Sequence, residues 1–201
     1  MVHLVRTLTI AAGLLAMTAG SAVAVEGSIF PLPGGARAGT PFVDGQFGAF
    51  RAGRKANRGC GRGHCGVDLH APDGTPVLAI RRGRVDQVER SADGRGGRWV
   101  RLLHEDGTST WYMHLADVRD DLVRGQDIVA GETLGTLGRT GVHSSPTHLH
   151  FAVSVGPPRR EQYLDPTRLL ERAELVSEPV SGPIAVPVPP ALAAEVHGPV
   201  R

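Results

Sequence analysis

The sequence predicts an all-β domain, a mainly antiparallel compact sheet or sandwich with only minor short helices. Three observations support this prediction. From Pro76 onward, short runs of β-favouring residues follow one another closely. Glycine-containing turn sequences separate these runs. A helix signal is confined to one short segment near the end. The all-β domain should therefore occupy roughly residues 65–170, and we find no internal repeats.

Each predicted strand is bounded by turn residues. The residues Glu105-Asp106-Gly107 are typical of a hairpin turn between two strands. Gly125 and Gly131 mark turns in a pair of short strands further on. The predicted strands cover 76–80, 83–90, 98–104, 108–115, two short runs within 115–138, and 147–155. A short helix over 165–175 should follow, with Asp165 as its N-cap and Pro166 at its first position.

The chain divides into four predicted parts. Residues 1–24 resemble a signal peptide, because His3 and Arg6 precede an apolar run that ends in an Ala-Val-Ala cleavage signal. Residues 25–58 form an extended lead-in rich in Gly and Pro, 59–172 the β domain, and 173–201 a Pro-rich tail that we expect to be disordered.

The apolar run is about ten residues long, whereas a spanning helix needs about 20, so a membrane anchor is the less favoured alternative. We expect an exported protein, periplasmic or extracellular, without stable membrane insertion after signal cleavage. The formal net charge of +2 is close to neutral and gives no sign of nucleic-acid binding.

The two cysteines, Cys60 and Cys65, lie close together in the chain. In an exported protein a disulfide is the default state of such a pair. It would stiffen the segment that carries His64. A thiolate metal site made by these cysteines and His64 is the less favoured alternative, because no second ligand pair follows at zinc-finger spacing.

Three strand-like segments carry histidine or aspartate on one face, because side chains alternate with a period of two along a strand. The segment 64–70 reads as extended rather than helical, although a helix would also align His64 with Asp68. The predicted polar faces hold His64, Asp68 and His70; Thr110, Tyr112 and His114; and His148, His150 and Ala152. The opposite faces are apolar: Val67 and Leu69; Trp111, Met113 and Leu115; and Leu149, Phe151 and Val153.

If the polar faces converge, they can supply a Zn²⁺ site made by His64, Asp68 and one histidine of the HLH pair. Catalytic zinc sites use three protein ligands and leave a position open. The remaining histidines would serve proton transfer. Each segment alone is weak evidence, since a His-X-His strand usually lies on a solvated face. Their ordered combination within one exported β domain is much less frequent by chance.

The same residues resemble the M23 family of zinc metalloendopeptidases, of the lysostaphin and LytM type. The matching stretches are HCGVDLHAPDGTPVLAIRRGRV, STWYMHL, VRGQDIVAGETLGTLGRTG and THLHF, so the resemblance covers roughly residues 45–170. It implies a compact antiparallel β fold with an open groove. It further implies that His64, Asp68 and His150 bind zinc, that His114 and His148 are the catalytic pair, and that the substrate is a peptide of bacterial peptidoglycan.

The sequence departs from the family pattern at three places. Ala152 stands where the family often has Glu. The segment before the HLH pair is one residue longer than usual, which leaves His143 near the site, and His70 replaces a small or apolar residue. For His70 and His143 we favour a place in the polar groove wall, and we expect His104, at the end of a strand, to be exposed.

Two other functional classes share features with this sequence. A non-catalytic relative would bind zinc and regulate another cell-wall hydrolase, but such proteins lose site residues, and here all five positions are filled. A lipoyl or biotin carrier would need a lysine in a hairpin, whereas the only lysine, Lys55, precedes the β region. The favoured function is therefore a zinc-dependent endopeptidase that hydrolyses cross-links or stem peptides of peptidoglycan.

Overall fold

The computed structural model describes residues 27–35, 45–50, 57, 59–142 and 144–179 of the 201-residue chain. The predicted signal peptide, Lys55, His143 and the last part of the predicted tail lie outside these residues. Within the described ranges, no helix is both long and apolar enough to cross a membrane.

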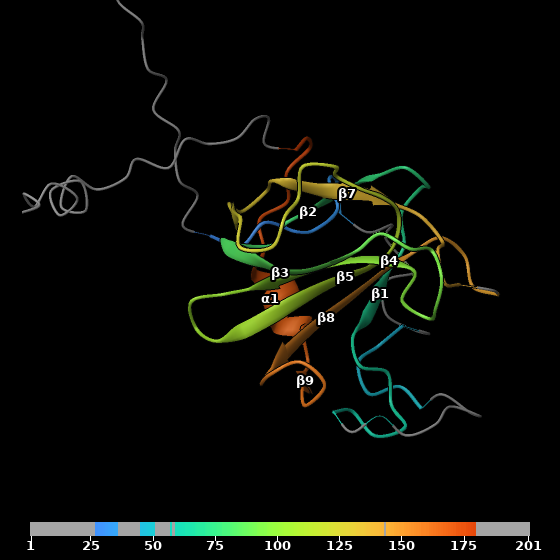
Figure 1. The fold of residues 1–201 in the computed structure, drawn as a ribbon. Coiled ribbons are helices and arrows are strands. Elements are labelled where there is room, and N and C mark those ends of the chain that lie inside the picture. The colour runs from blue at the N-terminus through green and yellow to red at the C-terminus, as the bar shows by residue number, and fades with distance from the viewer. Residues whose placement is uncertain (1–26, 36–44, 51–56, 58, 143, 180–201) are drawn as a thin grey trace, which may run out of the picture.

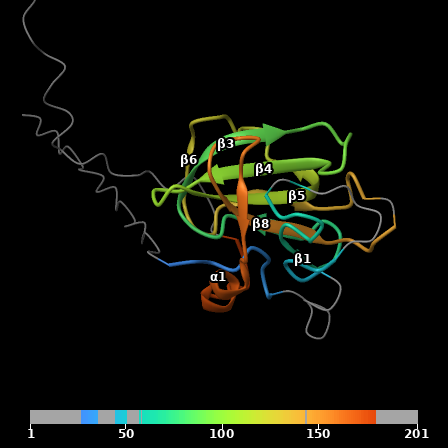
Figure 2. The same cartoon turned by 90° about the horizontal axis from the view of Figure 1, so that it is seen from below.

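Nine strands form one sheet, and their pairings are antiparallel, which confirms the predicted fold class. The main run of neighbours is β1–β8–β5–β4–β3–β6, and Figure 2 shows its central strands stacked in this order. The strands are β1 (Val67–Leu69), β2 (Pro76–Leu78), β3 (Gly83–Glu89), β4 (Arg98–Leu103), β5 (Thr108–Val118), β6 (Asp127–Ile128), β7 (Thr133–Leu137), β8 (Leu149–Val155) and β9 (Gln162–Leu164). The sequence predicted each of them except β9.

Strand β5 joins two layers of the domain. Its first part, Thr108 to Met113, pairs with β8, whereas Leu115 to Val118 pairs with β7. The β2–β7 pair lies above the main run of strands in Figure 1. Apolar side chains from both layers form the core, which leaves the opposite face of the main sheet available for a site. The core includes Val77, Leu134 and Leu137 from the β2–β7 layer, and Val100, Leu102, Tyr112, Leu115 and Phe151 from the main sheet.

The ends of the domain pack onto this core. The helix α1 (Thr167–Arg172) has Pro166 as its N-cap, one residue later than predicted. Asp165 still satisfies the end of the helix, because its Oδ1 accepts a hydrogen bond from the Thr167 amide at 2.9 Å. Residues before the predicted domain contribute as well: Leu32 is fully buried in the core, and the Ile29 amide donates to the Ile80 carbonyl at 2.6 Å.

The prediction that His104 is exposed is wrong, because this side chain is only 5% exposed. Its Nδ1–H donates to the Arg82 carbonyl at 2.7 Å, and its Nε2 accepts a hydrogen bond from Thr110 at 2.9 Å. Thr110 is hydrogen-bonded in turn to the Tyr112 hydroxyl, which accepts the Ile80 amide. His104 is thus the end of a buried polar chain that holds β5 against the core, which strand-end position alone does not reveal.

Candidate metal centre

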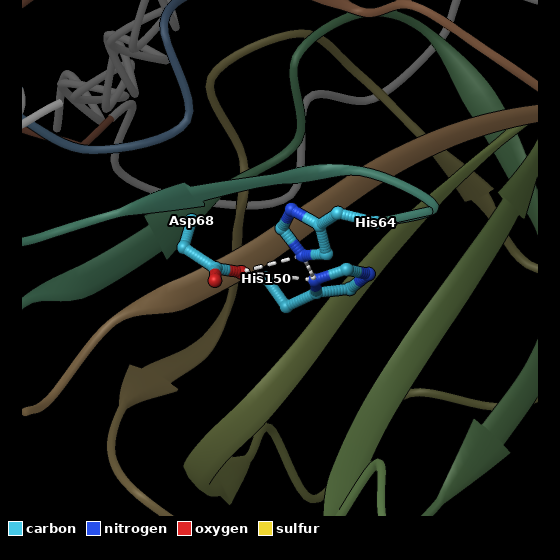
Figure 3. Close-up of side chains that lie close together, drawn as sticks. All are labelled: His64, Asp68 and His150. Atoms are coloured by element: carbon cyan, nitrogen blue, oxygen red, sulfur yellow. Dashed lines mark hydrogen bonds and ion pairs between the residues drawn. The ribbon is translucent and has the colours of Figure 1, made fainter. Parts of the chain in front are cut away.

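Three side chains meet where β1 runs beside β8. Asp68 and His150 are direct cross-strand partners, and His64 lies in the segment that leads into β1. The His64 Nε2 is 2.9 Å from His150 Nδ1 and 3.1 Å from Asp68 Oδ1. The His150 Nδ1 is 3.0 Å from the same oxygen. Figure 3 shows the three side chains converging on one point, so the structure brings together the three predicted metal ligands.

Strand alternation explains why these groups face away from the core. Val67 and Leu69 on β1 are fully buried in the core, so Asp68 between them points to the other side of the sheet. The same rule applies on β8, where Leu149 and Phe151 are core residues and His150 lies between them. The faces predicted for these two segments are confirmed.

His64 is oriented by a backbone segment that the sequence did not single out. Its Nδ1–H donates to the carbonyls of Gly45 and Gln46, both at 3.1 Å, so its Nε2 presents a lone pair to the site. The Gly45 carbonyl also accepts the Asp68 amide at 3.0 Å. A Cβ at Gly45 would lie 2.6 Å from the Asp68 Cβ, so only glycine permits this close approach.

The electrostatics of the cluster favour the forms that bind a metal. Burial raises the pKa of Asp68, but the adjacent His150 and His64 rings oppose this and hold the pKa well below its usual range. Burial lowers the pKa of His150, although the Asp68 carboxylate opposes the change. A carboxylate and neutral imidazoles are the states in which these groups coordinate cations.

His148 and His114 stand next to this cluster. The His148 Nε2 lies 3.7 Å from Asp68 Oδ1, while its Nδ1–H donates to the Pro146 carbonyl at 2.7 Å. The His114 Nδ1–H donates to the Thr140 carbonyl at 2.9 Å, and its ring centroid is 4.9 Å from that of His148. Burial, with the neighbouring His150 and His148, lowers the pKa of His114 to about 4. Both rings are therefore anchored at Nδ1, which leaves Nε2 for proton exchange.

The faces predicted for β5 are right for His114 and Leu115 but wrong for Trp111, Tyr112 and Met113, and a β-bulge is the reason. Met113 pairs with Trp99 and Leu115 with Arg98, so His114 is an extra residue on the bulged strand. Its φ of 69° lies in the left-handed region. The bulge turns His114 to the side of Trp111 and Met113, which line the site, whereas Tyr112 is fully buried in the core.

An open groove with a volume of about 720 Å³ passes over the site. It is lined by all five predicted site residues, His64, Asp68, His114, His148 and His150. Both tryptophans of the chain, Trp99 and Trp111, lie along it as well. The tryptophans were not among the predicted site residues. Two features of the sequence could have indicated that they line the groove: the chain has only two tryptophans, and they lie on two strands joined by a hairpin.

The remaining candidates have the following positions. The Cα atoms of Cys60 and Cys65 are 5.4 Å apart, a separation that a disulfide spans. The predicted place of His70 in the groove wall is wrong, because His70 is not among the residues that line the groove. It is half-buried: its Nδ1–H donates to the Thr147 carbonyl at 3.1 Å, and its ring centroid is 5.6 Å from that of His148. Ala152 is fully buried and pairs with Trp111 across β5 and β8.

The chain is similar to several known proteins. An uncharacterized metalloprotease of Haemophilus influenzae is 37% identical over 123 residues, which are 61% of this chain and 23% of the relative. Peptidoglycan DD-endopeptidase ShyC of Vibrio cholerae is 37% identical over 90 residues, 45% of this chain and 20% of the relative. The chain thus spans about a fifth to a quarter of the length of these curated relatives.

Among solved structures, the catalytic domain of the antimicrobial peptidase lysostaphin from Staphylococcus simulans has the same fold. The TM-score is 0.52 at 33% identity, and the match covers 63% of this chain and 89% of that domain. Residues 62–166, more than half of the chain, match the family described as Peptidase family M23. The chain therefore belongs to peptidase family M23.

Proposed function

We propose that this protein is a zinc-dependent endopeptidase that hydrolyses peptide cross-links or stem peptides of bacterial peptidoglycan. The observation that carries the proposal is the cluster of three donor atoms of His64, Asp68 and His150, 2.9–3.1 Å apart, on an open groove beside two further histidines. The names of two similar proteins, a peptidoglycan DD-endopeptidase and an antimicrobial peptidase, support the choice of substrate.

His64, Asp68 and His150 fit a zinc ion by the chemistry of their donors. Two imidazole nitrogens and one carboxylate oxygen are typical ligands of catalytic zinc. Ligands of a tetrahedral zinc at about 2.0–2.2 Å lie about 3.3–3.6 Å from one another. The 2.9–3.1 Å separations among these three atoms are only slightly shorter. When bound, zinc supplies a Lewis acid that polarises a peptide carbonyl and acidifies water.

His114 and His148 are the catalytic pair in this proposal. Each ring donates its Nδ1–H to a backbone carbonyl, so Nε2 accepts a proton when the ring is neutral and donates one when it is charged. One ring takes the proton of the attacking water or delivers it to the leaving amine. The other hydrogen-bonds the oxyanion that develops on the scissile carbonyl.

The proposed location follows from the substrate and from the amino-terminal sequence. Peptidoglycan lies outside the cytoplasm, and residues 1–24 carry the features of a signal peptide. An oxidising compartment also accounts for a disulfide between Cys60 and Cys65, next to His64.

The test is digestion of purified sacculi of known cross-link chemistry by the full chain, with the released fragments weighed by mass spectrometry. The proposal predicts soluble fragments cut at a peptide bond, loss of cleavage with a chelator, and recovery when zinc is restored. Folded protein that holds zinc but cleaves no cross-linked sacculus would overturn the enzymatic proposal. That result would support a zinc-binding module that regulates another hydrolase.

A further inference from the structure

Next to His114, the groove has an apolar floor made by the side chains of Trp99, Trp111 and Met113. The two indole rings have centroids 5.2 Å apart. Trp99 belongs to β4 and the other two to β5, on the sheet face opposite the core. These side chains form an apolar surface that adjoins the proposed catalytic histidines directly, because His114 follows Met113 in the chain.

Trp111 is fixed from several sides. The Arg101 guanidinium lies 4.9 Å from its ring centroid, and its Nε1–H donates to the Ser154 hydroxyl at 2.9 Å. Arg101 is only 2% exposed and forms an ion pair with Asp86 at 3.0 Å. Ala152, the cross-strand neighbour of Trp111, adds no bulk beside the indole. The floor is therefore preorganised, which lowers the entropy lost when a substrate binds.

Among the described residues that line the groove, Arg95 is the only arginine or lysine, and Asp68 of the three-residue cluster is the only acidic residue. Arg95 is exposed, and no ion pair joins it to an acid in the described part of the chain. Such a guanidinium can bind a carboxylate without first breaking an internal contact.

The loop that carries Arg95 is held beside the site. The Gly96 carbonyl accepts the His114 amide at 3.1 Å. On its other side, Gly141 has a φ of 73°, and a Cβ there would lie only 2.5 Å from the Gly97 nitrogen. Because two backbone segments meet so closely, the backbone around Arg95 is fixed relative to His114, although its side chain extends into solvent.

We propose that Arg95, Trp99 and Met113 form a subsite for a substrate residue that bears a free carboxylate on an aliphatic stem. The Arg95 guanidinium binds the carboxylate, and the aliphatic part lies against Trp99 and Met113. This inference rests on the proposed function and specifies its substrate: a cross-linked stem peptide with a free carboxylate near the cleaved bond, in preference to an uncharged glycine bridge.

The test compares two synthetic substrates with the zinc-loaded full chain. One is a cross-linked stem-peptide dimer with its carboxylates free, and the other is the same dimer with every carboxylate converted to a primary amide. The native protein should cleave the free acid with a KM about tenfold lower than that of the amide. In the Arg95→Gln variant this ratio should fall to near one, with kcat changed less than twofold.

Arg139→Gln is the matched control. Arg139 is exposed on the loop next to Gly141 but does not line the groove, so the variant removes the same charge from the same region. It should preserve the preference for the free acid. A native protein that cleaves both dimers with equal KM, or an equal loss of preference in both variants, would overturn the subsite. Failure to cleave either dimer or any sacculus would instead overturn the proposed function.

Discussion

Strands β8 and β5 both carry histidines of the site, but they deliver them in different ways. On β8, ordinary alternation directs Leu149 and Phe151 into the core and His150 to the groove. On β5, the bulge at His114 breaks alternation, so that Tyr112 and Leu115 both face the core although they are three residues apart. The proposed metal-binding half of the site thus uses a regular ladder, whereas His114, one of the two proposed catalytic histidines, depends on a local irregularity.

The two halves of the site therefore depend on different interactions. The regular half is held by apolar packing and by the direct pairing of Asp68 with His150. The bulged half needs a residue in the left-handed region and a buried polar chain from His104 to Tyr112 that holds the strand. Each feature can be removed separately by substitution.

The largest expected effect concerns the regular half. Asp68→Ala removes the anionic ligand, so the zinc content should fall from about one per chain to below about 0.1, with loss of cleavage. His114→Ala should keep about one zinc while activity falls by about 10²–10⁴-fold. Zinc analysis and sacculus digestion of the two variants measure this contrast. The exposed Asp73→Ala is the control and should match the native protein.

The second effect concerns the polar chain beneath β5. Burial lowers the pKa of His104 to about 4 from an ordinary value of 6.5. Between pH 6.5 and 4, the unfolded state binds a proton at His104 while the folded state does not. The free energy of unfolding is therefore highest above pH 6.5 and falls as the pH is lowered towards 4. The free energy of unfolding should fall by about 2–3 kcal/mol across this range from this group.

Urea unfolding of metal-free protein between pH 4 and 7 measures the effect. The His104→Gln variant should show a flatter pH profile than the native protein, even if it is less stable at pH 7. Equal slopes for the two proteins would mean that His104 is not buried in its neutral form, and the support proposed for the bulged strand would be lost.

The smallest expected effect compares the backbone conformation at His114 with that at His150. At His114, replacement by Gly should leave the metal-free protein about 1 kcal/mol more stable than replacement by Ala, because alanine is strained at positive φ. At His150, in the regular part of β8, the order should reverse by about 0.5–1 kcal/mol. Denaturant unfolding of the four variants tests both signs, and the same order at both positions would contradict the bulge.

Much of the fold could be predicted because its signals are local. Gly125 and Gly131 mark turns and do have positive φ, and the runs between turn residues became strands. Strand β9 was missed because its three residues form a strand only by pairing with β8. The burial of His104 was missed for a related reason. Its hydrogen-bond partners are Arg82, just before β3, and Thr110 on β5, and a strand-end position says nothing of them.

The site residues likewise divide into those that local sequence patterns placed correctly and those that they did not. Alternation placed Asp68 and His150 correctly, since both lie in regular strands with apolar neighbours. It failed for Tyr112 and Trp111, because one inserted residue reverses the faces around it and depends on the pairing with β4. Ala152, which the sequence marked only as a missing carboxylate, lies buried beside Trp111.

The most direct test of the account uses two histidines that lie two residues apart on one face. We predict that His148→Ala retains about one zinc per chain while cleavage of sacculi falls by about 10²–10⁴-fold, and that His150→Ala loses the zinc. Zinc content measured on both purified variants, with circular dichroism to confirm folding, decides the matter. Loss of zinc in His148→Ala together with retention in His150→Ala would contradict the assignment of the metal centre.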